Sequence, residues 1–491
     1  MAEIRSALAL RPVELLLPLL LAFLLAVLVT FTKPTIGILV ALGSMLLLVS
    51  FFSPMIGLYW LVFSMLLGPE FLIGGGGLGG GSALGRGLTL RLDDFILLLV
   101  GFGWLAKVAL TKQGIVQLRT PLNRPIIFYV SACILATLIG VLAGRVRPLG
   151  GFFFLLKYYQ YFFLFFMAVN LVKTTQQIRT LVTASLVTCF FVSLYAISQI
   201  PSGERAVAPF EGEYGEPNTL GGYLVFMLAI VGGILALPRA VPNKLPYIVL
   251  LLSGIVALQA TLSRASFLAA GIIWLGFLAY FARRSFFVTM VMLAATVAIP
   301  LMAPHAVQER ILYTFTQAPD EGQIKVGGVR IDTSTSARLY SWKESWEFFM
   351  AHPLVGGGVT GGPFMDAMYP KVLVDTGLIG FVAFLVLLAV VFRVARDGYR
   401  QTPDPFMKGI SLGFLIGSVG LLAHAIGSNT FIIVRIMEPF WLYAALMTRL
   451  HAIGQEPGSS GLPHPTEKVR PAGGGTAPAA PWAARRLPGL R

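Results

Sequence analysis

Long apolar runs recur along nearly the whole sequence, and each is close to the length that crosses a lipid bilayer. A membrane-spanning helix needs about 20 mainly apolar residues. Such runs lie near residues 14–31, 35–52, 54–68, 93–110, 124–143, 151–171, 177–200, 219–237, 246–260, 265–281, 285–304, 372–394, 406–425 and 433–450. Because the second and third runs are short and adjacent, we expect about 12 to 14 spans. The sequence therefore predicts an all-α fold, a polytopic transmembrane helical bundle.

The balance of residue types supports a membrane protein over a soluble one. Hydrophobic residues make up 56% of the chain and charged residues 12%, whereas soluble domains carry about 25% charged residues. The formal net charge of +15 is spread over short basic clusters between the apolar runs, a pattern typical of topology signals and not of a nucleic-acid interface. Cys133 and Cys189 both lie inside apolar runs, so we expect neither a disulfide framework nor a zinc site.

Loop charge predicts the orientation of the spans. The loop from Lys107 to Arg124 holds four basic residues and no acidic one, and alternate loops after it repeat this bias. By the positive-inside rule these loops are cytoplasmic, as both termini then are. The intervening loops face outward, and the loop before residue 217 is correspondingly acidic, with Glu204, Glu211 and Glu213 among its residues.

Three segments are not predicted to be membrane spans. Residues 74–81 form a glycine-rich connection on the outer side, and residues 305–371 form the single long loop, which also faces outward. Residues 454–491 are rich in Pro, Gly, Ala and Arg and have no apolar period, so we expect a disordered cytoplasmic tail. The transmembrane domain is then expected to cover residues 1–453.

Two arginines lie at outward ends of predicted spans. Arg264 occupies a very short turn between two apolar runs. Arg338 lies in the first turn of residues 333–353, where apolar residues recur at helical spacing and predict an amphipathic helix in the outer interface, with the hydroxyl residues at its start as N-caps. An arginine close to hydrocarbon is either a snorkelling interfacial residue or part of a site that binds an anion.

A lipid diphosphate is the substrate class that suits arginines at an outer membrane face. A guanidinium binds phosphate oxygens bidentately, each contact contributes roughly 1.5–3 kcal/mol, and two would stabilise the charge on a departing diphosphate. The glycine-rich stretch 74–81 lacks the Gly-Lys-Ser/Thr ending of a phosphate-binding loop, and no His/Cys/Asp cluster has metal-ligand spacing. We therefore expect a reaction without nucleotide, metal or other cofactor.

Two further polar segments share the outward face. Residues 211–218 end in Asn218 and form either a capped turn before the next span or part of a site. The glycine-rich loop 356–362 is expected to be mobile and leads to Asp366. Asp366 is either a loop or cap acid, or a general base that accepts the proton of an attacking hydroxyl.

These motifs resemble a known family. They are, in chain order, Gly215-Glu-Pro-Asn218-x₄-Tyr223, Leu262-Ser-Arg264, Arg338-x₃-Trp342, His352-Pro-Leu-x-Gly-x-Gly358 and Asp375-Thr-Gly-Leu-Ile-Gly380. Over roughly residues 150–450 the sequence resembles the superfamily of O-antigen ligases and O-antigen or exopolysaccharide polymerases. The resemblance implies a glycosyltransferase that acts on undecaprenyl-diphosphate-linked glycans at the outer face of a bacterial inner membrane, within a helical bundle that opens laterally to lipid.

The resemblance also implies roles for individual residues. Arg264 and Arg338 would bind the diphosphate. Ligases that act on the lipid A core carry a histidine about eleven residues before the glycine that matches Gly377, where this sequence has Asp366. This difference favours a polymerase-type member, with Asp366 or Glu213 as general base. The expected supporting residues are Tyr214, Asn218, Ser263, Tyr369 and Arg435, although Arg435 and Glu438 are also spaced to pair with each other.

Two alternatives stay open at the level of sequence. A ligase would use the same chemistry but transfer the glycan to a lipid A core or another acceptor. A transporter would place ionisable residues along a path at mid-span, for which Lys157, close to the outer end of its span, is the main candidate. The expected partners are the lipid-linked glycan, the bilayer and other membrane proteins of polysaccharide assembly, without nucleic acid.

Overall fold

The computed structural model describes residues 34–73, 88–111, 119–211, 215–302, 304–320, 322–326 and 329–453. The chain divides into two units, Met1–Gly454 and Gln455–Arg491, and all described residues belong to the first. The apolar run at 14–31 and the tail at 454–491 lie outside the described residues.

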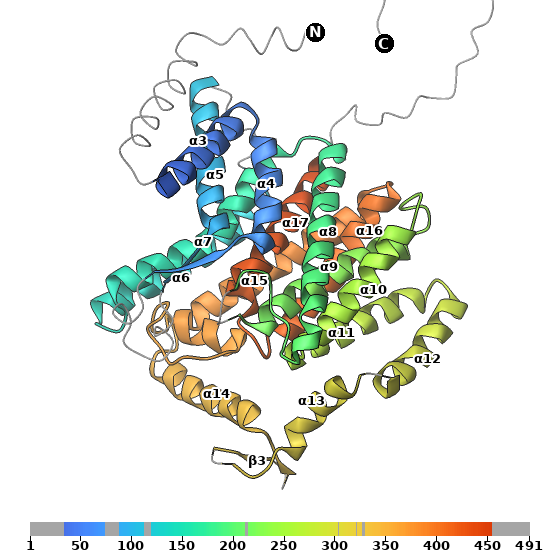
Figure 1. The fold of residues 1–491 in the computed structure, drawn as a ribbon. Coiled ribbons are helices and arrows are strands. Elements are labelled where there is room, and N and C mark those ends of the chain that lie inside the picture. Colours follow the sequence, from blue (N-terminus) through green and yellow to red (C-terminus); the bar gives the residue numbers. More distant parts are fainter. Residues whose placement is uncertain are drawn as a thin grey trace, which may run out of the picture. The chain divides into compact units, whose positions relative to one another are not determined.

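Helices occupy every predicted apolar run within the described residues, so the predicted all-α membrane bundle is confirmed (Figure 1). The helices of the bundle are α3 (Pro34–Phe52), α4 (Pro54–Leu67), α5 (Leu92–Thr111), α6 (Asn123–Leu142), α7 (Pro148–Leu171), α8 (Thr175–Ser198), α9 (Pro217–Ala236), α10 (Leu245–Ala260), α11 (Arg264–Phe281), α12 (Phe286–Met302), α15 (Met368–Gln401), α16 (Pro405–His424) and α17 (Val434–Ile453). The short 3-10 helices η1 (Ile200–Ser202) and η3 (Thr430–Ile432) lie in the connections.

Within the described residues, seven helices are long and apolar enough to cross a membrane. They are the helices that cover 123–142, 148–171, 175–202, 217–236, 264–281, 368–401 and 405–424. Four shorter apolar helices, at 42–52, 54–67, 245–260 and 286–299, accompany them. The sequence estimate of about 12 to 14 spans counted these shorter helices, the helices α5 and α17, and the run at 14–31.

The centre of the bundle is the pair α9 and α16. In α9, 83% of the apolar stretch is buried, against 22% in α11. The two helices approach backbone to backbone because glycines face each other: a Cβ on Gly233 would lie 2.3 Å from the carbonyl oxygen of Gly409, and one on Gly413 would lie 2.5 Å from that of Ala229. Small residues allow this close packing, which stabilises helix pairs in membranes.

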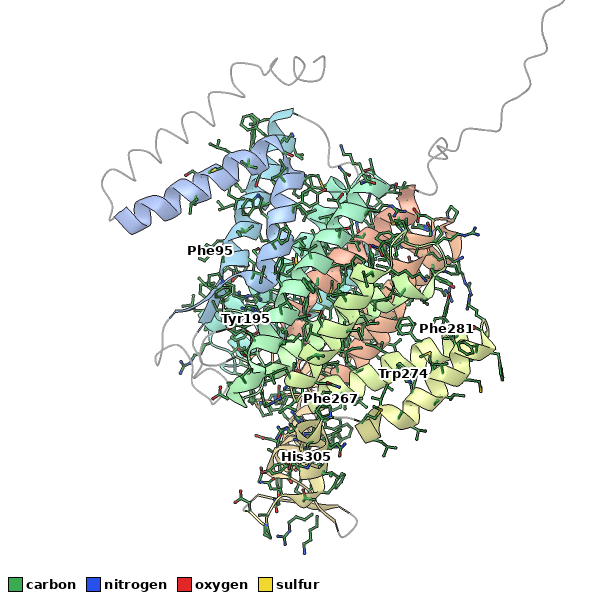
Figure 2. All side chains as sticks on the ribbon, turned by 45° about the vertical axis from the view of Figure 1, so that its right-hand side comes forward. Phe95, Tyr195, Phe267, Trp274, Phe281 and His305 are labelled. Atoms are coloured by element: carbon green, nitrogen blue, oxygen red, sulfur yellow. The ribbon has the colours of Figure 1, made fainter. Side chains whose placement is uncertain are left out.

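The periphery of the bundle is apolar and exposed. Leu142 is 87% exposed, Phe286 80% and Phe287 76%. Figure 2 shows side chains standing out along α11 and α12, which a hydrogen bond of 2.9 Å from Trp274 Nε1 to Thr296 Oγ1 joins. Apolar area left in water costs roughly 25 cal/mol per Å², so this surface suits lipid and not solvent.

A glycine breaks the long helix α15 near its start. Gly377 has φ 61° and ψ −163°, and the turn around it pairs with the loop before α15. Gly357 and Gly358 donate to the carbonyl oxygens of Val374 and Asp375 at 2.8 and 2.9 Å. Residues 356–359 are buried, so the loop that we expected to be mobile is fixed against α15.

Replacing Gly377 by alanine should lower the thermal midpoint of the purified protein. A Cβ there would lie 2.4 Å from the backbone carbonyl of Leu354, and the φ/ψ region is essentially restricted to glycine, which costs about 1–3 kcal/mol for other residues. Gly271→Ala in α11 is the matched control, because a Cβ there meets no atom within 4 Å and alanine favours a helix. Equal midpoints for the two variants would contradict this account.

Short elements cover the end of the bundle at which α11 and α15 begin. They are the helices α13 (His305–Thr316) and α14 (Thr333–Ala351) and the strand pairs β1 (Glu70–Ile73) with β2 (Leu88–Arg91) and β3 (Lys325–Val326) with β4 (Val329–Arg330), both antiparallel. Figure 1 shows α13, β3 and α14 together below the bundle. The strand pairs were not predicted, because four- and two-residue strands leave no periodic pattern.

The amphipathic helix expected after residue 333 is α14. Trp342 is 39% and Trp346 58% exposed, as an interfacial face requires. The helix ends at Ala351, close to the end of the predicted segment 333–353. Its N-cap, however, is Asp332 and not a hydroxyl residue: the Asp332 carboxylate accepts from the Thr335 backbone N–H at 2.8 Å. Asp332 was overlooked because it precedes the serine and threonine run.

Candidate functional site

A cavity lined by four arginines opens at the end of the bundle that α13 and α14 cover. Its lining residues are Arg205, Asn218, Arg264, Ala265, Arg310, Ser334 and Arg338, and its volume is about 50 Å³. This is well below the roughly 300–1,000 Å³ of pockets that bind drug-sized ligands, so the enclosed space suits a small anionic group and not a glycan chain. Four separate elements supply the arginines: the loop before α9, α11, α13 and α14.

Arg264 is held at the start of α11 by groups from the long loop. Its Nη1 donates to Thr314 Oγ1 at 2.6 Å and forms an ion pair with Asp332. Asp332 is 1% exposed. Burial acts to raise the pKa of Asp332, but hydrogen bonds from Thr335 and Arg264 outweigh burial and hold this pKa below its ordinary value. Asp332 therefore stays ionised, caps α14 and orients Arg264 at once.

Asn218 and Ser263 form the polar floor beside Arg264. Ser263 is the N-cap of α11 and donates its hydroxyl to Asn218 Oδ1 at 2.7 Å. Ser266 continues the chain to His424 Nε2 at 3.2 Å, and His424 Nδ1 lies 2.8 Å from Thr430 Oγ1. His424 is fully buried and both of its ring nitrogens have hydroxyl partners, as in a hydrogen-bonded core histidine.

Arg338 and Asp366 meet at the edge of the cavity. Arg338 Nη2 lies 3.9 Å from Asp366 Oδ2, and their side chains are 27% and 41% exposed. The expected base candidate thus lies next to one of the two expected diphosphate ligands, with access to solvent. Tyr369 has a structural contact instead: its hydroxyl donates to the Leu422 carbonyl oxygen at 2.6 Å and fixes the start of α15 against α16.

The charge of the cavity is strongly positive. Burial and the neighbouring charges of Arg310, Arg264 and Arg338 lower the pKa of Arg205 to about 10. Burial and Arg264 likewise lower the pKa of Arg310. Like charges gathered in this way create a positive potential that attracts and holds an anion. The site is therefore suited to a phosphate-bearing ligand.

Sequence reasoning missed two of the four arginines. Arg205 lies in a loop that is otherwise acidic, and Arg310 lies in a segment of mixed polarity with no motif around it. The role of these two arginines depends on which residues surround them in space, and the local sequence does not predict those neighbours. The two residues that sequence reasoning did select, Arg264 and Arg338, are brought to the same cavity by the fold.

Arg435 lies in a separate buried network and does not line the cavity. Its Nη2 lies 3.1 Å from Glu70 Oε1 and its Nε 3.5 Å from Glu211 Oε1, while Nη1 donates to the carbonyl oxygens of Leu66 and Pro209. The considered pairing with Glu438 is not the one observed, since Gln160 donates to Glu438 Oε1 at 3.2 Å.

Glu211 lies in the loop before α9, outside the spans. Burial raises the pKa of Glu211 to about 7, and the charge of Arg435 opposes this shift. The Arg435 network ties the β1–β2 hairpin and the loop that carries Arg205 to the start of α17. Its role is to position the loop beside the arginine cavity.

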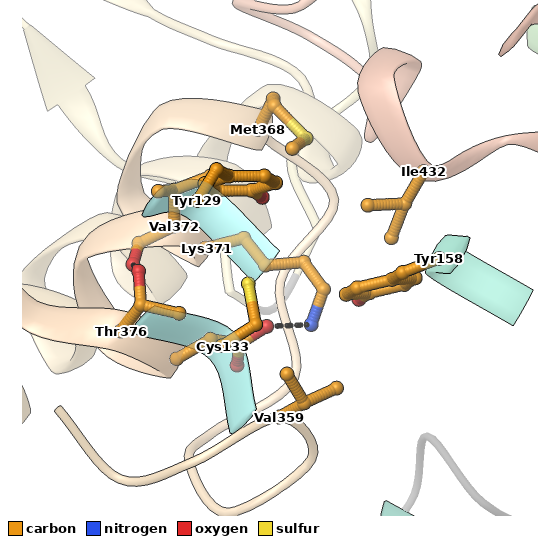
Figure 3. A pocket seen from close by; sticks show the side chains of 10 residues that line it. Tyr129, Cys133, Tyr158, Val359, Met368, Lys371, Val372, Thr376 and Ile432 are labelled. Carbon is orange, nitrogen blue, oxygen red and sulfur yellow. Dashed lines mark hydrogen bonds and ion pairs between the residues drawn. The ribbon is translucent and has the colours of Figure 1, made fainter. Parts of the chain in front are cut away.

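A second, smaller cavity of about 10 Å³ lies between α6, α7 and α15 (Figure 3). Lys371 reaches into it between Cys133 and Tyr158, and its Nζ is 3.0 Å from Asp375 Oδ2. Lys371 is the one cation among its described lining residues, and Asp375 already neutralises it. This cavity therefore lacks the charge excess of the arginine cavity.

Three further candidate residues from the sequence are Glu213, Tyr214 and Lys157. Glu213 and Tyr214, expected as a base and a supporting residue, lie outside the described residues. Lys157, the main residue in favour of a transport path, forms an ion pair with Asp94 in the first turn of α5. A paired lysine beside the end of α5 is a structural ion pair, and it does not mark a mid-membrane path.

Comparison with known families supports the motif resemblance. Residues 247–385 match the family model described as O-antigen ligase. This segment is therefore similar to the O-antigen ligase family. It includes Arg264, Arg310, Arg338 and Asp366, that is, three of the four arginines and the acid at the cavity edge. No curated protein matches the chain. The match supports a membrane protein of the O-antigen ligase and polymerase type, and it does not distinguish a polymerase from a ligase.

Proposed function

We propose that this protein is a polymerase of surface polysaccharide, either O-antigen or exopolysaccharide. It would transfer a glycan from undecaprenyl diphosphate to a sugar hydroxyl of a second lipid-linked unit. The observation that carries the proposal is the convergence of four arginines from separate elements on one cavity at one end of the bundle. A diphosphate at the membrane interface is the anion that this arrangement fits.

The proposed mechanism uses the arginines for binding and for charge stabilisation. The acceptor oxygen forms a bond to the anomeric carbon of the donor glycan, and the bond from that carbon to the diphosphate oxygen breaks with its electron pair on the diphosphate. Guanidiniums already in place stabilise the charge that develops there without reorganisation. Asp366 takes the proton of the acceptor hydroxyl. The donor brings its own leaving group, so the proposal assigns no nucleotide and no metal.

The proposed location is the inner membrane of a bacterium, with both termini in the cytoplasm. Basic loops at the far end of the bundle support this orientation by the positive-inside rule. The arginine cavity then faces outward, where the lipid-linked donor and the acceptor glycan meet.

Lipid analysis of a deletion strain tests polymerase against ligase. Loss of a polymerase leaves single repeat units on the lipid carrier, whereas loss of a ligase leaves long chains on it. Asp366 at the place of the ligase histidine supports the polymerase. The ligase is the second candidate, because the matching family is described by that activity. Long carrier-linked chains in the deletion strain would establish the ligase and end the polymerase proposal.

Replacing Asp366 by asparagine should lower glycan transfer by about 10²–10⁴-fold, the usual contribution of a general base. Asparagine keeps the size of the side chain and removes its ability to take a proton. Binding of a prenyl diphosphate should persist, because the arginines of the cavity remain. Transfer rate and diphosphate affinity, measured on the same purified variant, check both statements. An unchanged rate would assign the base to another residue.

A further inference from the structure

Arg205 and Arg310 differ from the other two arginines of the cavity in their partners. Arg205 Nε donates to the Thr261 carbonyl oxygen at 3.1 Å. Arg310 has its guanidinium 6.0 Å from the Tyr313 ring centroid, and its Nε is buried without a hydrogen-bond partner. In the part of the chain that the structure describes, no carboxylate lies within ion-pair distance of either arginine.

The other two arginines each face a carboxylate. Arg264 forms the ion pair with Asp332, and Arg338 lies 3.9 Å from Asp366. The cavity therefore has two arginines with a carboxylate within ion-pair distance and two without one. Arg205 and Arg310 are the part of the site with the strongest preference for added negative charge: the charged neighbours of Arg205 are arginines, and Arg310 has Asp332 only beyond ion-pair distance.

The proposed reaction changes the charge of the lipid diphosphate. Before transfer, both phosphates are esterified, one to lipid and one to sugar, so each has one ionisable oxygen. When the bond to the sugar breaks, its electron pair stays on the terminal phosphate and adds one negative charge. An additional charge in a confined site is stabilised most by cations that lack another anionic partner.

We propose that Arg205 and Arg310 recognise this additional charge, so that the cavity binds the free lipid diphosphate more tightly than the glycosylated one. Arg264 and Arg338 hold the diphosphate in both states. Arg205 and Arg310 then act mainly as the bond breaks, which makes them specificity-determining residues for the leaving group. This inference rests on the proposed transfer from a lipid diphosphate and adds a division of roles among the arginines.

Binding of two soluble probes to the full-length protein in detergent tests the inference. The probes are farnesyl diphosphate and the same compound with a methyl ester on its terminal phosphate, which removes the extra charge. The wild-type protein should bind the free diphosphate about ten-fold more tightly than the ester, as one charge-assisted contact predicts. Arg205→Gln and Arg310→Gln should bring this ratio close to one. Arg264→Gln should weaken binding of both probes and leave the ratio unchanged.

Two further variants control for charge and for folding. Arg310→Lys keeps the positive charge and should retain most of the preference. Arg330→Gln removes an exposed arginine of the same long loop and should change neither affinity, while thermal midpoints verify that each variant is folded. A ratio that stays near ten in Arg205→Gln and Arg310→Gln would overturn the inference. Equal binding of both probes by the wild type would also overturn it and leave the proposed function standing, whereas binding of neither probe would overturn both.

Discussion

Cells that carry Arg264→Ala should lose long polysaccharide, because the loss of one charge-assisted contact to the diphosphate, about 1.5–3 kcal/mol, should lower glycan transfer by about 10–10²-fold. Two effects add at this position. The diphosphate loses a bidentate ligand, and Asp332, which is 1% exposed, loses the cation that faces it. The length distribution of the surface polysaccharide and the transfer rate of the purified protein measure the loss.

Substitution by lysine separates the two effects at Arg264. Lysine can preserve the ion pair with Asp332 but cannot bind two phosphate oxygens in the planar geometry of a guanidinium. Arg264→Lys should therefore restore the thermal midpoint more fully than the transfer rate. Arg330→Ala, at an exposed position of the same loop, should have wild-type values for both. Normal long polysaccharide from well-expressed Arg264→Ala would remove the arginine cavity from the mechanism.

Replacing Arg435 by methionine should destabilise the protein by about 3–5 kcal/mol, as breaking a buried ion pair from one side does. Arg435 is 1% exposed, and its loss leaves Glu70 and Glu211 without the guanidinium between them. Three backbone carbonyl oxygens, of Leu66, Gly68 and Pro209, lose a donor as well. The thermal midpoint of the purified protein, compared with the wild type at the same pH, measures the effect.

The loss in Arg435→Met should depend on pH. Because the pKa of Glu211 is raised to about 7 by burial, this carboxylate is mostly ionised at pH 8 and mostly protonated at pH 5.5. An unpaired buried carboxylate is costly only when charged, so the difference in midpoint should be larger at pH 8. Adding Glu211→Gln should recover part of the loss at pH 8 and little at pH 5.5. A difference that does not change with pH would mean that Glu211 is not the group left unpaired.

The sequence could predict the features of this protein that repeat or that are locally costly. Apolar runs of about 20 residues specify helices in a bilayer, because only internally hydrogen-bonded segments are stable there. Arg264 and Arg338 could be singled out because an arginine close to hydrocarbon is energetically costly unless it reaches the interface or lies in a polar site. The structure places both arginines in the lining of one cavity.

What the sequence could not predict are contacts between distant segments. Arg435 and Glu70 are 365 positions apart, and nothing near either residue in the sequence indicates that they pair. The meeting of Arg205 and Arg310 with Arg264 likewise depends on how α13 folds back over the end of α11. Such contacts follow from packing, which one sequence without the fold does not report.

The break in α15 at Gly377 makes the start of this helix and the loop before it one structural unit. The loop before the helix supplies backbone partners to the broken turn, since the Leu378 N–H donates to the Pro353 carbonyl oxygen at 2.8 Å and the Gly357 N–H to that of Val374 at 2.8 Å. Chimeras that exchange the long loop with that of a relative should therefore take residues 353–379 together. A junction placed between the loop and the helix would separate backbone groups that have no other partner in a bilayer.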